Sequence, residues 1–395
     1  MNYSKLILKP KKEESLMRFH PWVFSGAIAS AEGVTDGDVV EIHSSDGAFL
    51  GVGHFQSATI MVRLLSFKPT IIDVAFWKDS FRRARQLRLL TGLASSPTSN
   101  TFRLIHGEGD GLPGLVIDIY GQTAIIQAHS IGMHRSRKDI AAALLEVLAD
   151  SISRIYYKSE GTLPSRAGMT DENEYLYGSE SADAHIALEN GLQFRIDWLK
   201  GQKTGFFIDQ RENRTLLERY AQGRDVLNMF CYTGGFSVYA LRGGAATVHS
   251  VDSSAKAIAL TNENVALNYP DDPRHQSFAD DAFRFMETID NRYDLIILDP
   301  PAFAKHKDAL RNALQGYRKL NAIALSKIKS GGILFTFSCS QIVSKMDFRL
   351  TVFSAAAQTG RNVRILHQLT QPADHPINIY HPEGEYLKGL VLQVD

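Results

Sequence analysis

The most constraining feature of this sequence is a regular alternation of apolar runs and helical patterns between residues 191 and 395. The runs DVLNMF (225–230) and YDLIIL (293–298) are each followed by a loop and a helical pattern, and ILFTF (333–337) follows the second of these helices. Strands that alternate with helices indicate a parallel sheet with helices on both faces. We therefore expect residues 191–395 to form a doubly wound α/β domain.

Two further segments precede this domain. Residues 1–68 contain short alternating runs, and Ser-Ser-Asp-Gly (44–47) between two of them is a hairpin signal, so we expect a small β-barrel. Residues 69–190 read as a helix, two strands joined by Gly121-Gln122, a second helix and a further strand, which predicts a small α+β module. The polar stretch 166–185 is expected to be a long loop with one or two short strands.

Composition excludes several classes of protein. A chain of 395 residues is too long for one ordinary core, and its 44% hydrophobic and 22% charged residues are typical of a soluble globular protein. No apolar run approaches the roughly 18 residues of a membrane span, and the N-terminus lacks the apolar core of a signal peptide. The formal net charge is zero, so a nucleic-acid-binding surface would have to be local.

Only two cysteines are present, Cys231 and Cys339, and they form no cluster with histidines. This argues against a disulfide framework and against zinc, and it favours a reducing cytoplasm. We expect a cytoplasmic protein without a structural or catalytic metal.

The first chemical motif is the loop FCYTGGF, which ends one predicted strand and begins a helix. Gly234 and Gly235 allow a tight turn and a close approach to a ligand at the helix N-terminus. Asp252 ends the next strand, where such folds place an acid on the hydroxyls of a ribose. A simple strand-to-helix turn with a capping aspartate explains the same residues. Phe230 and Tyr232 stand where a dinucleotide-binding fold requires glycine, which argues against a nicotinamide cofactor.

Two acidic positions follow on later strands. Asp281 could accept a hydrogen bond from an adenine amino group, or it could simply cap a helix. Asp299 and Pro300 end the apolar run 295–298, at the carboxyl edge where ligands bind in open α/β sheets. The prolines of Asp-Pro-Pro also explain a rigid strand exit without any ligand.

Cys339 lies in the Ser-Cys-Ser triplet that follows the buried strand 333–337. Because parallel strands end at one edge of a sheet, we expect its thiol to emerge beside the glycine loop and Asp299, where it could act as a nucleophile. A lone cysteine is more often a small buried apolar residue.

Taken together, the motifs resemble those of a known family. FCYTGGF, DPPAF, FTFSCS and ADHPINIYHPEGEYLKG, with HPWVFSGAI, GDGLPGLVIDIYG and GQKTGFFIDQREN, resemble the bacterial 23S ribosomal RNA 5-methylcytosine methyltransferases of the RlmI type. The resemblance runs in order along nearly the whole chain. It implies a PUA-like RNA-binding domain (1–68), a central α+β module (69–190) and a Rossmann-like methyltransferase domain (191–395).

The resemblance also implies S-adenosylmethionine as cofactor and large-subunit ribosomal RNA as partner. Cys339 matches the family's catalytic cysteine, which adds to carbon 6 of cytosine, and Asp299 would contact the ring near nitrogen 3. Phe206 would line the cofactor pocket, with Gln210 and Arg211 near the methionine carboxylate. The residues expected to bind the cofactor are Phe206, Gln210, Arg211, Asn228, Phe230, Tyr232, Thr233, Gly234, Gly235, Asp252, Ser253, Asp281, Asp299 and Pro300.

Local basic patches could serve RNA binding in a neutral chain. The early KPKK with Arg18 and His20 is one, and the predicted helix with Arg82, Arg83, Arg85 and Arg88 is another. Trp22 is expected in the barrel core. The segment 373–389 carries His375, His381 and Glu383 and resembles a substrate loop of unassigned role.

Three other functions stay open. Asp-Pro-Pro-Ala-Phe resembles the loop of methyltransferases that modify an exocyclic base amine, although Phe303 is displaced from the usual aromatic position. Such enzymes need no cysteine, so Cys339 discriminates against them. A non-catalytic RNA-binding assembly factor is a second alternative, and a nicotinamide oxidoreductase is a third. A homodimer is one of the oligomeric states that the sequence leaves open.

Overall fold

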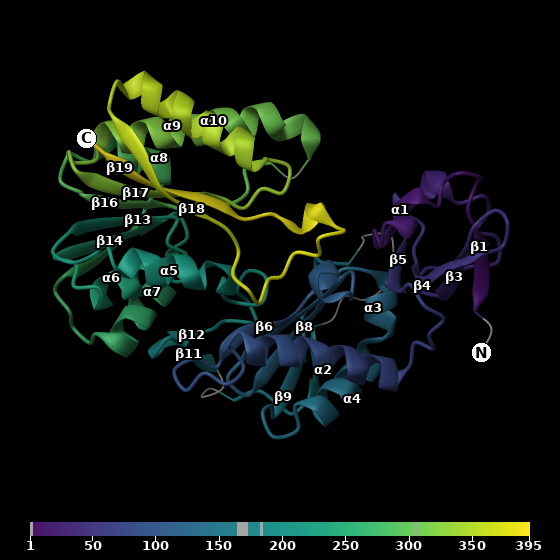
Figure 1. The fold of residues 1–395 in the computed structure, drawn as a ribbon. Coiled ribbons are helices and arrows are strands. Elements are labelled where there is room, and N and C mark those ends of the chain that lie inside the picture. The colour runs from purple at the N-terminus through teal and green to yellow at the C-terminus, as the bar shows by residue number, and fades with distance from the viewer. Residues whose placement is uncertain (1–2, 164–172, 182–184, 305) are drawn as a thin grey trace. The chain divides into compact units, whose positions relative to one another are not determined.

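The computed structural model describes residues 3–163, 173–181, 185–304 and 306–395. Contacts between residues divide the chain into two compact units, whose elements are labelled in Figure 1. Unit 1 comprises Met1–Gly191, Ile196–Ile208 and Ala373–Gly384, and unit 2 comprises Leu192–Arg195, Asp209–Pro372 and Glu385–Asp395.

Unit 1 begins with a five-stranded sheet in the order β1-β3-β4-β5-β2. Its elements are β1 (Ser4–Ile7), α1 (Glu14–Met17), β2 (Trp22–Phe24), β3 (Val39–His43), β4 (Phe49–Phe55) and β5 (Ile60–Ser66). The predicted hairpin is confirmed, because β3 pairs antiparallel with β4 across residues 44–48. An isolated bridge between Leu8 and Ile28 links the segments that follow the two edge strands, as in a barrel that curves toward closure.

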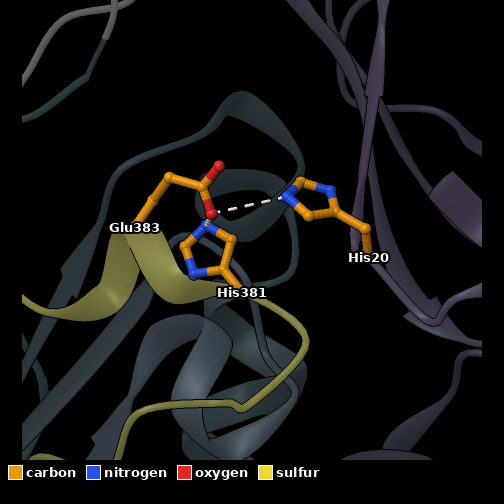
Figure 2. A group of neighbouring side chains, drawn as sticks. All are labelled: His20, His381 and Glu383. Carbon is orange, nitrogen blue, oxygen red and sulfur yellow. Dashed lines mark ion pairs between the residues drawn. The ribbon is translucent and has the colours of Figure 1, made fainter.

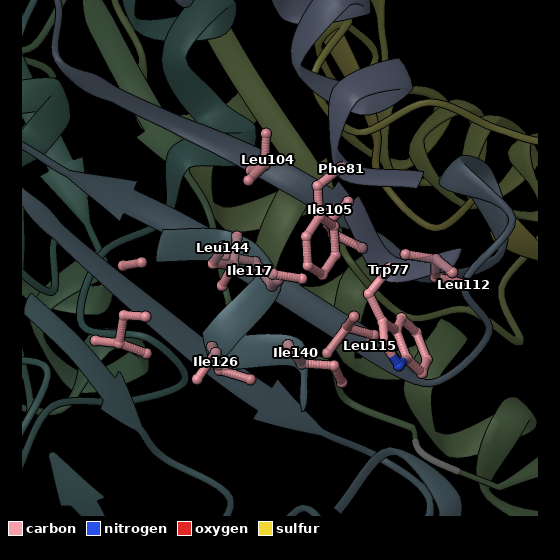
Figure 3. Close-up of a cluster of buried hydrophobic side chains, with 14 of the residues drawn as sticks. Trp77, Phe81, Leu104, Ile105, Leu112, Leu115, Ile117, Ile126, Ile140 and Leu144 are labelled. Atoms are coloured by element: carbon pink, nitrogen blue, oxygen red, sulfur yellow. The ribbon is translucent and has the colours of Figure 1, made fainter. Parts of the chain in front are cut away.

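The second part of unit 1 is a five-stranded sheet in the order β10-β9-β8-β7-β6 with two helices packed on it. Its elements are α2 (Val74–Leu90), β6 (Thr101–His106), β7 (Leu115–Tyr120), β8 (Thr123–Ala128), α3 (Ile131–Arg135), α4 (Arg137–Val147), β9 (Arg154–Tyr157), β10 (Glu174–Tyr177) and β11 (Ile186–Glu189). Figure 3 shows its core, where Trp77 and Phe81 of α2 and Leu144 of α4 meet the isoleucines and leucines of the sheet. Burial of these side chains stabilises the module by about 1.5–3 kcal/mol each before entropy is subtracted.

One strand of this module was not predicted from the sequence, and one predicted loop lies partly outside the described residues. β6 is the strand that the sequence did not predict, and its Arg103 is paired with Asp118 at 2.7 Å. The predicted loop 166–185 contains β10, and its residues 166–172 and 182–184 lie outside the described residues.

Arg88 corrects one predicted basic patch. Its side chain is fully buried rather than exposed, and its guanidinium forms a bidentate ion pair with the carboxylate of Asp110. It also donates to the backbone carbonyl of Asp374 at 2.9 Å, which ties the segment 373–384 to α2. Arg82 and Arg83 are exposed as expected. Of the four arginines on this helix, the one at position 88 therefore stabilises unit 1 instead of presenting charge.

Unit 2 confirms the expected α/β architecture. Its seven-stranded sheet has the order β15-β14-β13-β16-β17-β19-β18, with the first five strands parallel and β19 antiparallel to both neighbours. Its elements are β12 (Leu192–Arg195), α5 (Arg211–Glu218), β13 (Asp225–Met229), α6 (Gly235–Arg242), β14 (Thr247–Asp252), α7 (Ala255–Asn268), β15 (His275–Ala279), α8 (Ala282–Thr288), β16 (Leu295–Leu298), α9 (Leu310–Lys327), β17 (Gly332–Ser338), α10 (Lys345–Thr359), β18 (Val363–Leu369) and β19 (Lys388–Val394).

Helices cover both faces of this sheet. In Figure 1, α8, α9 and α10 lie on one side and α5, α6 and α7 on the other. The strand order reverses at β13, where β14 lies on one side and β16 on the other, which is the position at which doubly wound folds bind their ligands. Among the described residues, no helix combines the length and the apolar character needed to cross a membrane.

Candidate active site

The candidate residues of unit 2 collect at the carboxyl edge of the parallel strands. The glycine loop (residues 230–235) follows β13, Ser253 follows β14, Asp299 follows β16 and Cys339 follows β17. Neighbouring strands β13, β16 and β17 are paired directly, so their ends lie side by side. The edge predicted from the sequence is therefore where the sheet places these residues.

The glycine loop has a strained backbone that neighbouring side chains hold in place. Phe230 and Tyr232 have φ values of 59° and 47°, and Gly234 has 75°. Such left-handed conformations cost about 1–3 kcal/mol each for residues other than glycine. Two α7 side chains hold the loop: Thr261 Oγ1 donates to the Tyr232 carbonyl at 2.9 Å, and Asn264 donates to the Thr233 carbonyl at 2.8 Å.

Glycine is required at position 234 for space as well as for conformation. A Cβ atom there would lie 2.7 Å from Cγ2 of Thr261. At Gly235 it would meet Cδ of Arg214 at 3.1 Å. Because these two residues lack side chains, the loop can turn directly into α6. The backbone N–H groups at the N-terminus of α6 are then accessible to a ligand.

Asp252 fixes the same loop from β14. Its carboxylate accepts hydrogen bonds from the backbone N–H groups of Tyr232 at 3.1 Å and Ser254 at 2.9 Å. A half-buried carboxylate with both oxygens oriented at the sheet edge can still accept hydrogen bonds from vicinal hydroxyls, because each oxygen has two lone pairs. Ser253, beside it, is exposed.

Asn228, the fourth residue of β13, ends a buried polar chain. Its amide donates to Ser237, whose hydroxyl bonds Ser250, which in turn bonds His275. The amide oxygen of Asn228, Oδ1, is buried and has no hydrogen-bond partner among the described residues. A buried acceptor of this kind costs free energy unless a ligand or water satisfies it.

Asp281 has the helix-capping role that was the alternative to adenine binding. Its side chain accepts from the backbone N–H of Arg284 at 3.0 Å at the start of α8, and it is exposed. This contact leaves the second carboxylate oxygen for other partners.

Asp299 is connected to the segment before the first strand of the sheet. Gln210 Nε2 donates to Asp299 Oδ2 at 3.1 Å, and Asn213 donates to Gln210 Oε1 at 2.6 Å. Gln210 therefore orients the carboxylate of Asp299, a contact that the sequence did not suggest. Arg211 is buried at the start of α5. Phe206 is buried in unit 1, where its carbonyl accepts from the Tyr120 hydroxyl at 3.4 Å.

The Ser-Cys-Ser triplet separates into one accessible thiol and two structural hydroxyls. Ser338 and Ser340 are buried, and Ser340 Oγ donates to the carbonyl of Ala304 at 2.6 Å. Cys339 is half-buried, and its Sγ lies 3.9 Å from the carbonyl oxygen of Pro300. The other cysteine differs: burial raises the pKa of Cys231 to about 12, so its thiol stays protonated and unreactive.

Sequence reasoning missed Lys388, the first residue of β19. This lysine is only 4% exposed and pairs in register with Ser338. Its ammonium donates to the carbonyls of Ser340 at 2.6 Å and Tyr386 at 2.8 Å. A lysine within the apolar run LKGLVLQV is the signal that could have found it, because lysine is almost never fully buried without a partner.

Trp22 and the histidines of the segment 373–384 lie together in unit 1. Trp22 is half-buried rather than in the barrel core, because its indole donates to Glu108 at 2.8 Å and packs edge-on against His381. In Figure 2, Glu383 Oε2 lies 3.5 Å from His20 Nε2 and 3.7 Å from His381 Nε2.

His20, His381 and Glu383 are residue types that can bind metal ions, but their donor atoms are farther apart than the ligands of a bound metal ion. Their donor atoms lie within 4.8 Å of one another, and the longer separations exceed the roughly 3.3 Å between ligands of a tetrahedral zinc ion. Burial lowers the pKa of His381, so this ring is neutral at pH 7. The absence of a metal therefore stays a prediction.

The residues at the edge of the sheet fit an S-adenosyl group. A turn without side chains at Gly234 and an oriented acid at the end of β14 suit a nucleoside with a ribose and a charged tail, and the buried Oδ1 of Asn228 can accept a further hydrogen bond.

Comparisons with known proteins agree with this geometry. The family model of S-adenosylmethionine-dependent methyltransferases matches residues 162–382, and that of PUA-like domains matches residues 6–67. The ribosomal RNA large subunit methyltransferase I of Alteromonas mediterranea is 38% identical over 397 residues, which cover 99% of both chains.

Two solved structures share the architecture over their whole length. A candidate SAM-dependent methyltransferase from Streptococcus mutans superposes with a TM-score of 0.84 at 26% identity, covering 99% of this chain and 100% of that one. A candidate methyltransferase solved in complex with SAH gives a TM-score of 0.86 at 26% identity with the same coverage. S-adenosylmethionine is therefore the cofactor, and the chain belongs to the ribosomal RNA large subunit methyltransferase I family.

Proposed function

We propose that this enzyme forms 5-methylcytidine in large-subunit ribosomal RNA through a covalent bond between Cys339 and carbon 6 of the target cytosine. The observation that carries the proposal is the half-buried thiol of Cys339, which follows β17 at the carboxyl edge of the sheet, while Asp299 follows the paired strand β16. The substrate class comes from the names of the relatives, and the ring position comes from the chemistry of the thiol.

The chemistry requires a nucleophile because carbon 5 of cytosine does not attack alkyl groups by itself. When the Cys339 thiolate forms the S–C6 bond, the electrons of the C5–C6 double bond become available at carbon 5. S-adenosylmethionine supplies the methyl group. Loss of the carbon 5 proton to a base then restores the double bond and releases the thiolate.

Asp299 has the second role in this mechanism. Negative charge develops on the ring as sulfur adds, and a carboxyl group near nitrogen 3 stabilises it by donating or sharing a proton. The contact with Gln210 at 3.1 Å holds the carboxylate in one orientation before the base arrives. The target base must leave its stack to reach the edge of the sheet.

We assign cofactor binding to the glycine loop and its neighbours. Backbone N–H groups at the start of α6 and the carboxylate of Asp252 would contact the S-adenosyl group, and Oδ1 of Asn228 would gain a partner. Phe206, Gln210, Arg211, Ser253, Asp281 and Pro300 stay in the proposed set.

A surface on unit 1 favours an RNA partner. Phe19, Phe24 and Tyr380 are 48%, 43% and 51% exposed, although solvent exposure of aromatic rings is unfavourable. The rings of Phe19 and Tyr380 lie 5.3 Å apart, and Phe19 has a left-handed φ of 62°. Arg18 adds an exposed guanidinium, which is paired with the exposed Glu14 at 2.5 Å. Exposed rings beside basic side chains are typical of surfaces that stack unpaired bases. We propose that residues 1–68 bind RNA, while 69–190 and 191–395 form the central and methyltransferase domains of a cytoplasmic enzyme.

The exocyclic amine alternative is weaker because the ring of Phe303 is engaged in packing against α9. Its ring packs against that of Tyr317 at 4.5 Å between centroids and lies over Gly316. Tyr317 is fully buried and Phe303 is half-buried, so this aromatic pair contributes to the packing of α9.

The decisive experiment is methyl transfer from labelled S-adenosylmethionine to 23S RNA that lacks this modification, followed by nucleoside analysis. Wild type and Cys231→Ser should give 5-methylcytidine, whereas Cys339→Ser should give none while still binding the cofactor. RNA that contains 5-fluorocytidine at the target should trap a protein–RNA adduct with wild type and not with Cys339→Ser, because fluorine blocks the final proton loss. Full activity in Cys339→Ser, or an amino-methylated base as product, would refute the proposal.

A further inference from the structure

Lys388 is a buried cation held next to the candidate nucleophile. The residues on both sides of Cys339 contact it: Ser338 is its partner in the β17–β19 register, and the Ser340 carbonyl accepts from its ammonium at 2.6 Å. The second acceptor is the Tyr386 carbonyl at 2.8 Å. These contacts fix the ammonium at the start of β19, directly across from the thiol-bearing turn.

Several charged and titratable groups face this ammonium. Burial lowers the pKa of Lys388 to about 8, while the Cys339 thiolate and Glu385 raise it and Lys345 lowers it. Lys345 and Glu385 pair with each other at the surface, which weakens the effect of both. Tyr317 on α9 interacts with Cys339 and Asp299 rather than with Lys388; burial raises its pKa to about 12, so it is neutral at physiological pH. The Cys339 thiol is thus the group whose ionisation couples most strongly to the charge of Lys388.

We propose that Lys388 is a positioning residue whose ammonium stabilises the Cys339 thiolate and so supplies the nucleophile of the proposed reaction. When the S–H bond breaks, the proton leaves to solvent and the ammonium keeps its three hydrogens. The Ser340 and Tyr386 carbonyls accept two of these, and the positive charge stays at the carbonyl of the residue that follows Cys339. The use of the thiolate as a nucleophile rests on the proposed function. Its stabilisation by Lys388 does not, since the ionisation of Cys339 can be measured without RNA.

A buried ammonium suits this purpose better than a surface lysine. An opposite charge within about 4–6 Å shifts the pKa of a neighbouring group by about 1–3 units, and the effect weakens when water screens it. The same burial keeps Lys388 in one position, so its charge acts on the thiol in every turnover. A lysine whose only role was to cap the turn would need its hydrogen bonds and not its charge.

The test is the pH dependence of alkylation of Cys339 by iodoacetamide, followed by mass spectrometry of the peptide. In wild type the midpoint should lie about one unit or more below the roughly 8.5 of an ordinary thiol. In Lys388→Met the midpoint should rise by about one unit or more, with at least tenfold slower alkylation below both midpoints. Lys388→Arg should keep the low midpoint, because the charge remains.

Lys345→Met is the matched control, because it removes a nearby lysine that is exposed and paired with Glu385. Its midpoint should stay within a few tenths of a unit of wild type. Calorimetric binding of S-adenosylhomocysteine reports whether each variant is folded. A wild-type midpoint at or above 8.5 overturns the proposal without any variant, and so does an unchanged midpoint in folded Lys388→Met. If the shift appears but Cys339→Ser still methylates RNA, the proposed reaction fails and the role of Lys388 stands.

Discussion

The glycine loop offers a direct test of the cofactor site through Gly234→Ala. A methyl group at this position would stand 2.7 Å from Cγ2 and 3.2 Å from Cα of Thr261, so either the loop or α7 must move. Gly331→Ala is the matched control. Gly331 has a similar φ of 79° against 75°, but nothing lies within 4 Å of its Cβ position, and it precedes β17 at the opposite end of the strand from Cys339.

The difference between the two variants isolates the contact with α7. Alanine in the left-handed region costs about 1–2 kcal/mol at either position. At Gly234 overpacking adds about 1–3 kcal/mol, because Thr261 is also bonded to the Tyr232 carbonyl and cannot turn away freely. Since the displaced loop is the proposed cofactor contact, we expect binding to weaken by about 10–100-fold.

Isothermal titration with S-adenosylhomocysteine measures this change, and urea unfolding measures stability. Gly331→Ala should lose about 1 kcal/mol of unfolding free energy and retain wild-type affinity. If Gly234→Ala binds the cofactor as tightly as Gly331→Ala does, then the glycine loop is not the cofactor contact.

Three further predictions concern stability and reactivity. Arg88→Met should lower the unfolding free energy of unit 1 by about 3–5 kcal/mol, since it leaves a buried carboxylate without its cation, whereas the exposed Arg82→Met should change it by less than about 0.5 kcal/mol in the same urea titration. Burial lowers the pKa of His54 to about 4 against 6.5 in the unfolded chain, so the stability that neutral His54 provides is complete above pH 6.5 and is lost as the pH falls toward 4. Between pH 7 and pH 5 the loss should be about 2 kcal/mol, and His54→Phe should show a correspondingly smaller decline. Cys231 should resist alkylation at pH 8 in the folded protein and react only after denaturation, and rapid modification of the native protein at this residue would contradict its described burial.

The methyltransferase sheet could be predicted from the sequence because its signals are local. The central parallel strands β13, β16 and β17 are short, largely apolar runs bounded by turns, and the candidate site residues stand at or just after the ends of these runs. β18 and β19 escaped prediction for the opposite reason. β19 enters between β17 and β18 as an antiparallel strand, and nothing in its apolar pattern states which neighbours it pairs with.

The same distinction separates the site residues. Asp252 and Cys339 were found because they follow strands, whereas Lys388 was missed because its significance depends on a register across two strands that lie far apart in the sequence. The contact of Gln210 with Asp299 joins residues 89 positions apart and has no local signal. Charge alone misled the prediction at Arg88, whose guanidinium is buried against the carboxylate of Asp110 and the carbonyl of the distant Asp374.

The position of the segment Ala373–Gly384 in the sequence affects when unit 1 can finish folding during synthesis. It belongs by contact to unit 1, and Gly109 receives it so closely that a Cβ there would lie 1.9 Å from the Pro376 carbonyl. During synthesis, N-terminal regions usually fold first. Here Asp374, whose carbonyl accepts a hydrogen bond from Arg88, leaves the ribosome 286 residues after it. The part of unit 1 that ends at Ile208 must therefore remain incomplete while residues 209–384 are synthesised, and we expect it to be most exposed to chaperones and proteases during that time.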